Sequence, residues 1–249
     1  MKILGLIGKN IGYTRSPEIF KAFFESGSWQ LDYKVFDLED IHLVEELFKN
    51  PDLLGFNVTI PYKQDILNYV DEQSPDVVRL KNANTIVIYP SGKKKAFNTD
   101  IYGIKKSLQQ FLSKDFQNIK ALILGTGATA RSFSYVLEQM NIPHLFASRK
   151  PEGKNQIEYD ELSEEMIKKH RLIINTTPLG NMHSPASKPD IPYAFLTSHH
   201  YLFDVHYVPE ETLFLKEGKK REAKTINGWL MLKYQAEKAW EIWKNELNL

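Results

Sequence analysis

A glycine-rich segment near the middle of the chain has the spacing of a dinucleotide-binding loop. Gly125-Thr126-Gly127-Ala128-Thr129-Ala130 follows a short apolar run and precedes a helical pattern. In such a loop the first glycine makes a tight turn and the second lets the backbone approach a pyrophosphate. The small third residue lets the helix pack on the strand, and the helix N-terminus offers N–H groups to the phosphates. The segment predicts a dinucleotide site, with a plain glycine-rich turn as the alternative.

The end of the next predicted strand indicates which dinucleotide binds. An NAD-binding domain usually has Asp or Glu about 20 residues after the loop, where the carboxylate binds the ribose hydroxyls. Here the strand ends in Ser148-Arg149-Lys150. These cations would bind a 2′-phosphate, which a carboxylate would repel. We therefore predict NADP as the cofactor, although Glu152 weakens this interpretation and Arg149 and Lys150 could be ordinary exposed loop residues.

Polar side chains gather at the ends of three predicted strands in the first hundred residues. Ligands of open α/β sheets bind at strand ends, and polar groups in a central strand need partners. The pattern therefore predicts a site for a polyhydroxylated molecule. The residues are Asn57, Thr59 and Lys63 at the first strand, Asn84 and Thr85 at the second, and Asn98, Thr99 and Asp100 at the third.

Two hydroxyl side chains, Thr14 and Ser16, come just before a predicted helix whose first residues are Pro17 and Glu18. Two hydroxyls beside an exposed helix N-terminus form a receptor for a carboxylate. Ser16 is also a typical N-cap residue, followed by proline at the first helical position. On this segment alone the N-cap interpretation is favoured.

The elements that must position these residues alternate between strands and helices. This alternation predicts a mostly parallel sheet covered by helices. A hairpin turn is expected around Ser91-Gly92, beside Lys93-Lys94-Lys95. The predicted strands cover residues 3–7, 33–38, 56–60, 85–89, 121–124, 144–147, 172–175 and 201–205. Helices are predicted to begin at Ser16, Asp40 and Trp229, a further one to follow Asp100, and another to follow the glycine-rich loop and run to Met140.

Composition narrows the function classes. The chain has 249 residues, with 32 lysines and arginines against 31 aspartates and glutamates. Binding to a phosphate backbone needs a basic excess, so this balance argues against nucleic acid as the main partner. The absence of cysteine excludes disulfides and thiolate zinc sites, and we expect no metal. No stretch approaches the roughly 20 apolar residues of a membrane helix, so we expect a cytoplasmic protein with no membrane partner.

Taken in order along the chain, these and similar segments resemble those of shikimate dehydrogenases. Their joint occurrence is specific, although no single segment is decisive. They are Gly5-Leu6-Ile7-Gly8, Thr14-x-Ser16-Pro17, Asn57-Val58-Thr59-Ile60-Pro61-x-Lys63, Ala83-Asn84-Thr85, Asn98-Thr99-Asp100-x-x-Gly103, Gly125-x-Gly127, Asn175-Thr176-Thr177-Pro178-Leu179-Gly180, Asp204-x-x-Tyr207-x-Pro209 and Met231-Leu232-x-x-Gln235.

The resemblance implies a fold and an activity. The implied fold is an N-terminal α/β substrate domain, residues 1–101 with 228–249, and a Rossmann-type NADP-binding domain, residues 102–227, with the active site in the cleft between them. The implied reaction is the NADP-dependent, reversible reduction of 3-dehydroshikimate to shikimate, a step toward chorismate and the aromatic amino acids. The implied enzyme binds a small-molecule substrate and is a monomer or a homodimer.

The same resemblance implies residue roles. Lys63 matches the family's catalytic lysine and Asp100 its partner aspartate, and both also face the substrate. Thr14 and Ser16 match the hydroxyl pair that holds the substrate carboxylate. The other matches are Thr59, Asn84, Tyr207 and Gln235 around the substrate, Gly125 to Ala130 and Ser148 to Lys150 at the NADP phosphates, and Val205 and Gly228 near the nicotinamide.

One departure from the family pattern bears on specificity. Where the family usually has His-Ser-x-Ser-Pro, this chain has Tyr13-Thr14-Arg15-Ser16-Pro17. Thr14 keeps the hydroxyl and adds a methyl group, which could shift the preference between shikimate and quinate, whose ring is bulkier near the carboxylate. A quinate/shikimate dehydrogenase of relaxed specificity is therefore an alternative.

Two more distant alternatives are a methylenetetrahydrofolate dehydrogenase and a non-catalytic, NADP-sensing relative. The polar side chains of Asn84, Asp100 and Gln235 favour a hydroxylated ring over a pterin. The presence of both Lys63 and Asp100 favours an enzyme, because a sensor has no need of the pair.

Overall fold

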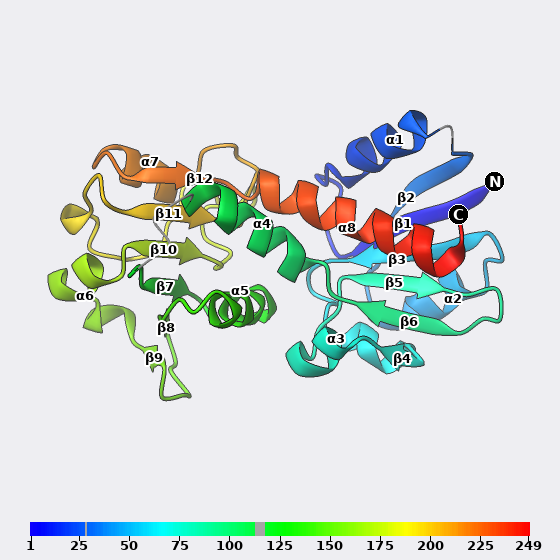
Figure 1. The fold of residues 1–249 in the computed structure, drawn as a ribbon, viewed down its shortest axis with the longest axis horizontal. Coiled ribbons are helices and arrows are strands. Elements are labelled where there is room, and N and C mark those ends of the chain that lie inside the picture. The colour runs from blue at the N-terminus through cyan, green and yellow to red at the C-terminus, as the bar shows by residue number, and fades with distance from the viewer. Residues whose placement is uncertain (28, 113–117) are drawn as a thin grey trace. The chain divides into compact units, whose positions relative to one another are not determined.

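The computed structural model describes residues 1–27, 29–112 and 118–249. The chain forms two compact units (Figure 1), each with its own sheet. Unit 1 comprises residues 1–103 and 232–249, and unit 2 comprises residues 104–231. In the described part of the chain, no helix is both long enough and apolar enough to span a membrane.

Unit 1 is built on a six-stranded sheet in the order β2-β1-β3-β5-β6-β4. β1 pairs in parallel with β2 and β3, whereas β5 pairs antiparallel with β3 and β6. β4 pairs in parallel with β6, so the prediction of a mostly parallel sheet is confirmed, with β5 running against the other strands of this sheet. The turn at Gly92 is too short for a crossover and joins β5 to β6 as a hairpin. The strands are β1 (Lys2–Gly8), β2 (Leu31–Asp37), β3 (Leu53–Val58), β4 (Glu72–Gln73), β5 (Thr85–Ile88) and β6 (Lys94–Phe97).

The helices of unit 1 include α1 (Ser16–Ser26), the 3-10 helix η1 (Ile41–Leu43), α2 (Val44–Phe48), the 3-10 helix η2 (Asp65–Tyr69) and α3 (Pro75–Leu80), and α4 (Asp100–Leu112) begins there. Asp40 caps η1 as predicted, accepting from the backbone N–H of His42. The prediction that Ser16 is an N-cap is wrong. Ser16 is the first helical residue, and the N-cap, Arg15, makes no side-chain cap bond.

The C-terminal helix α8 (Trp229–Leu247) is anchored in the core of unit 1. Trp243 is completely buried, and its indole N–H donates to the carbonyl oxygen of Ile86 in β5 at 2.9 Å. Gly55 in β3 permits this approach, because a Cβ there would lie 2.3 Å from the same carbonyl oxygen and 2.7 Å from the indole nitrogen. The anchor fixes the polar face of α8, including Gln235, beside the sheet.

Unit 2 is a Rossmann-type α/β fold with an all-parallel sheet in the order β12-β11-β10-β7-β8-β9. Every residue of β7, β10 and β11 is buried, as expected for parallel strands covered on both faces. The strands are β7 (Ala121–Leu124), β8 (His144–Ala147), β9 (Gln156–Ile157), β10 (Leu172–Asn175), β11 (Tyr201–Asp204) and β12 (Lys224–Ile226). The helices are α5 (Ala128–Gln139), α6 (Glu164–Lys169) and α7 (Leu213–Lys219), with 3-10 helices η3 (Tyr159–Glu161) and η4 (Tyr193–Phe195).

Candidate active site

A lysine–aspartate pair lies where β3 and β6 end in unit 1. Lys63 follows β3, Asp100 is the first residue of α4, and Lys63 Nζ donates to Asp100 Oδ2 at 2.6 Å. The two side chains are only 13% and 5% exposed. A buried ion pair of this kind is expensive to desolvate and needs further hydrogen bonds around it. The surroundings of Asp100 supply them.

Asn84 is the centre of those surroundings. Its Nδ2 donates to Asp100 Oδ1 at 2.9 Å, to Thr99 Oγ1 at 3.0 Å and to Gln235 Oε1 at 3.2 Å. Its Oδ1 accepts from the backbone N–H of Thr99 at 2.7 Å. Four of the residues predicted to contact substrate, Lys63, Asp100, Asn84 and Gln235, therefore form one hydrogen-bonded cluster. Thr99, one of the polar residues predicted at the strand ends, belongs to it as well.

The predicted carboxylate receptor is a pair of adjacent hydroxyls. Thr14 Oγ1 donates to Ser16 Oγ at 3.2 Å, and the Ser16 backbone N–H contacts Thr14 Oγ1 at 3.3 Å. Ser16 is buried and Thr14 is half-buried. The Ser16 hydroxyl thus accepts from Thr14 and does not cap α1.

Tyr33 in β2, a residue that the sequence analysis did not single out, is buried and bonds to Asn57. The Tyr33 hydroxyl donates to Asn57 Oδ1 at 2.8 Å. Burial raises the pKa of Tyr33 well above its usual value. The sequence analysis placed Tyr33 only at the start of a predicted strand.

Asn57 and Thr59 were among the polar residues predicted to form a site for a polyhydroxylated molecule. Asn57 is buried, and its Nδ2 donates to the carbonyl oxygen of Asn84 and to Thr85 Oγ1. Its amide thus holds protein groups together and does not face a ligand. Thr59 is half-buried just past β3. Its methyl group packs against Gly8, because a Cβ added to Gly8 would lie 2.6 Å from the Thr59 methyl carbon.

In unit 2, the loop after β7 has the form that a phosphate requires. Gly125 has a φ of +101°, and a Cβ there would lie 3.0 Å from Thr176 Oγ1. A Cβ on Gly127 would meet no atom within 4 Å, which leaves an open cradle. No side chain caps α5, so its first N–H groups face that cradle without a side-chain partner. Residues Gly125 to Ala130 therefore fit a pyrophosphate.

The predicted 2′-phosphate residues follow β8. Ser148 Oγ accepts from the backbone N–H of Lys150 at 3.2 Å and donates to its carbonyl oxygen at 3.0 Å, which curls the loop. Arg149 and Lys150 are exposed, and within the described residues neither forms an ion pair. Two unpaired cations beside a hydroxyl fit a phosphate group.

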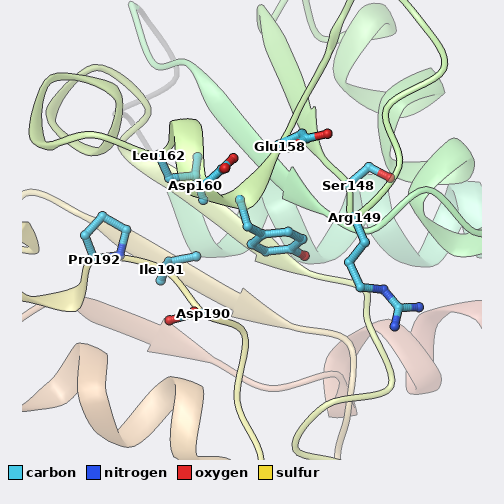
Figure 2. Close-up of a pocket in the computed structure, with 9 residues that line it drawn as sticks. Ser148, Arg149, Glu158, Asp160, Leu162, Asp190, Ile191 and Pro192 are labelled. Carbon is cyan, nitrogen blue, oxygen red and sulfur yellow. The ribbon is translucent and has the colours of Figure 1, made fainter.

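A cavity of about 520 Å³ adjoins this loop (Figure 2), lined by Ser148, Arg149 and residues after β9 and β10. Its wall also carries Glu158, Asp160 and Asp190, acidic residues that the sequence analysis did not anticipate. In Figure 2 the Arg149 side chain points away from Glu158 and Asp160. The cavity thus has a cationic side and an acidic side.

The remaining predicted residues lie around the end of β11. Val205 and Gly228 are in close contact, because a Cβ on Gly228 would lie 2.1 Å from the Val205 carbonyl oxygen. Gly228 N donates to the His206 carbonyl oxygen at 2.9 Å. The Tyr207 ring packs against Trp229, with centroids 6.4 Å apart. Three of the predicted positions, Val205, Tyr207 and Gly228, are therefore gathered in one loop cluster.

A closed ring of hydrogen bonds fixes that cluster. Asp204 Oδ1 accepts from the backbone N–H of His206, and His206 Nε2 lies 2.7 Å from the Thr177 carbonyl oxygen. Thr177 Oγ1 donates to Asn175 Oδ1, and Asn175 Nδ2 donates back to Asp204 Oδ2. The ring joins the loops that follow β10 and β11. Burial raises the pKa of Asp204, and the nearby His206 opposes the shift.

The chain is similar over nearly its whole length to proteins of known family. The family model of the shikimate dehydrogenase substrate binding domain matches residues 6–86. A shikimate dehydrogenase (NADP(+)) from Clostridium botulinum is 34% identical, covering 98% of this chain and 96% of the relative. The crystal structure of shikimate dehydrogenase 1 from Peptoclostridium difficile is 32% identical with a TM-score of 0.87, covering 98% and 92% of the two chains. The shikimate 5-dehydrogenase of Thermus thermophilus, solved with NADP(H) and shikimate, is 25% identical with a TM-score of 0.86, covering 99% and 95%.

Proposed function

The chain belongs to the shikimate dehydrogenase family, and from that premise we propose that it catalyses the NADP-dependent, reversible reduction of 3-dehydroshikimate to shikimate. The observation that carries the proposal is the buried Lys63–Asp100 pair, set in a cluster of amide and hydroxyl groups. This arrangement offers a proton donor beside groups able to bind ring hydroxyls.

Lys63 is the proposed proton-transfer residue. When the ketone is reduced, Lys63 Nζ donates a proton to the carbonyl oxygen as negative charge develops there, and in the reverse direction it accepts the proton. Asp100, 2.6 Å from Nζ, orients the ammonium group and faces a substrate hydroxyl. Bound NADPH supplies the hydride for the carbonyl carbon.

The neighbouring polar groups are the proposed substrate receptor. Thr14 and Ser16 hold the carboxylate with their hydroxyls, and Asn84 and Gln235 face the ring. The match to the family adds Thr59 and Tyr207 to this set. Fixing the substrate at several points places the carbonyl carbon for transfer, which lowers the entropic part of the barrier.

For the cofactor we propose that Gly125 to Ala130 bind the pyrophosphate and that Ser148, Arg149 and Lys150 bind the 2′-phosphate. Support comes from the open cradle at Gly127 and the unpaired cations after β8, as described above. Val205 and Gly228 are assigned to the nicotinamide from the family match. We further propose that residues 1–101 with 228–249 form the substrate domain and 102–227 the NADP domain of a cytoplasmic enzyme.

The test is to follow absorbance at the nicotinamide band while the purified protein meets shikimate or quinate with NADP or NAD. Rapid reduction with shikimate and NADP, and slow or no reduction in the other mixtures, is the expected result. Comparable rates with quinate would favour the relaxed-specificity enzyme, for which the Thr14 methyl is the relevant feature. No reduction in any mixture, with NADP still bound, would overturn the proposal.

A further inference from the structure

His206 joins two loops of unit 2 that follow neighbouring strands. β10 ends at Asn175 and β11 ends at Asp204, and His206 belongs to the loop after β11. Its Nε2 lies 2.7 Å from the carbonyl oxygen of Thr177, in the loop after β10. A carbonyl oxygen only accepts, so this ring nitrogen carries a proton and donates it. The side chain of His206 therefore ties the β11 loop to the β10 loop by a hydrogen bond of fixed direction.

The β10 end of this bond packs against the glycine turn that we propose for the pyrophosphate. A Cβ added to Gly125 would lie 3.0 Å from Thr176 Oγ1 and 3.3 Å from the Thr177 methyl carbon. Thr176 is held on the strand before the turn, because its Oγ1 donates to the Leu124 carbonyl oxygen at 2.6 Å. The Thr177 carbonyl group that His206 binds is thus part of a segment seated on the Gly125 turn.

The backbone of His206 holds the pair that we propose for the nicotinamide. Its carbonyl oxygen accepts from the backbone N–H of Gly228 at 2.9 Å, and its own N–H donates to Asp204 Oδ1 at 3.0 Å. Gly228 in turn packs on Val205, where a Cβ would lie 2.1 Å from the Val205 carbonyl oxygen. One residue therefore connects the Val205–Gly228 pair, through its backbone, with the segment on the Gly125 turn, through its side chain.

We propose that His206 is a positioning residue for hydride transfer, which sets the nicotinamide loop relative to the pyrophosphate turn. A dinucleotide held by its phosphates still needs its reacting ring held against the substrate carbon. An error of about 1 Å in such a placement can slow a reaction about a hundredfold. The inference rests on the proposed function, because it takes the Gly125 turn and the Val205–Gly228 pair as parts of the NADP site.

His206→Leu tests the inference, because leucine fills space but cannot donate to Thr177. In a single turnover with shikimate and saturating NADP, the rate of NADPH formation should fall about tenfold, the effect of losing about one net hydrogen bond. Adenosine 2′,5′-bisphosphate has the 2′-phosphate but no nicotinamide, and calorimetry should show its affinity unchanged. Together the two measurements separate a misplaced nicotinamide from a general loosening of unit 2, which would weaken binding of the bisphosphate as well.

His206→Gln is the conservative variant. The glutamine amide can present an N–H group at about the place of the histidine Nε2, so its single-turnover rate should lie within about threefold of the wild-type rate. His144→Leu is the matched control. It removes another half-buried histidine of unit 2, whose Nε2 lies 2.7 Å from Ser134 Oγ. His144 pairs with Ala121 where β7 and β8 begin, at the sheet edge opposite the cofactor loops, so this variant should keep the wild-type rate.

Three results would each overturn the inference: a wild-type rate in His206→Leu, a rate in His206→Gln as low as that of His206→Leu, or an equal loss of rate and of bisphosphate affinity. A wild-type protein that does not reduce NADP with shikimate would overturn the proposed function and this inference together. An active wild type with any of the three results would overturn the inference alone.

Discussion

Lys63 Nζ and Asp100 Oδ2 lie 2.6 Å apart, although the two residues are separated by 37 positions in the chain. Replacing the lysine removes the proposed proton donor and leaves the cofactor residues intact. We expect Lys63→Ala to lower kcat by about 10²- to 10⁴-fold, with NADPH binding largely unchanged by fluorescence titration. Lys93→Ala, which removes an exposed lysine paired with Glu72, is the control. It should keep the wild-type kcat and the wild-type NADPH affinity. Near-normal turnover of Lys63→Ala would refute the assignment.

Asp100→Asn tests the other half of the pair. Asparagine keeps the shape and still presents an oxygen to Asn84, but it loses the charge that orients the lysine. Hydrogen bonds to charged groups contribute about 1.5–3 kcal/mol, so kcat should fall by about tenfold to a hundredfold. Steady-state kinetics and a melting curve together separate this effect from unfolding. A stable variant with wild-type kcat would remove Asp100 from the mechanism.

Arg149→Ala tests the cofactor preference. Loss of the guanidinium should raise the KM for NADP by about tenfold or more, because a charge-assisted bond to phosphate disappears. The KM for NAD, which has no 2′-phosphate, should stay the same, so the measurement is the ratio of the two. Arg221→Ala, another exposed arginine of unit 2, is the control. If the KM values for NADP and NAD rise equally, Arg149 does not bind the 2′-phosphate.

Thr14→Ser tests specificity at the carboxylate. The hydroxyl that donates to Ser16 is retained, and only the methyl group is lost. The additional space should favour the bulkier quinate ring, raising the quinate-to-shikimate ratio of kcat/KM by up to about tenfold. Parallel assays with both substrates measure it. A ratio that does not move would show that the methyl group plays no part in specificity.

Two buried histidines of unit 2 predict how stability depends on pH. Burial lowers the pKa of His170 and of His200, and His200 Nδ1 accepts from the Thr197 backbone N–H, so it must stay neutral. The unfolded chain takes up protons below about pH 6.5, while the folded protein does not until the pH is lower. The free energy of unfolding should therefore be fully retained above about pH 6.5 and fall as the pH drops below it.

Urea unfolding between about pH 8 and pH 5 measures this dependence. His200→Gln has no proton to gain, so its stability should fall less steeply below about pH 6.5 than that of the wild type. The exposed His199 is the control position, and His199→Gln should keep the wild-type slope. Equal slopes for all three proteins would mean that His200 does not contribute.

Features that depend only on neighbouring residues could be predicted from the sequence. The turn at Gly125, the strand before it and the helix after it are read from adjacent positions, because glycine conformation and apolar periodicity are local properties. The resemblance in ordered motifs likewise identified the family and pointed to Lys63 and Asp100.

Contacts between residues far apart in the chain became visible only in the folded protein. Asn84 and Gln235 are 151 positions apart and are brought together by the anchoring of α8 through Trp243. The Ser16 hydroxyl looked like a cap in the sequence, but in the fold it accepts from Thr14 and does not cap α1. A hydroxyl takes whichever partner packing places within reach, and side-chain packing between elements leaves no periodic trace in the sequence.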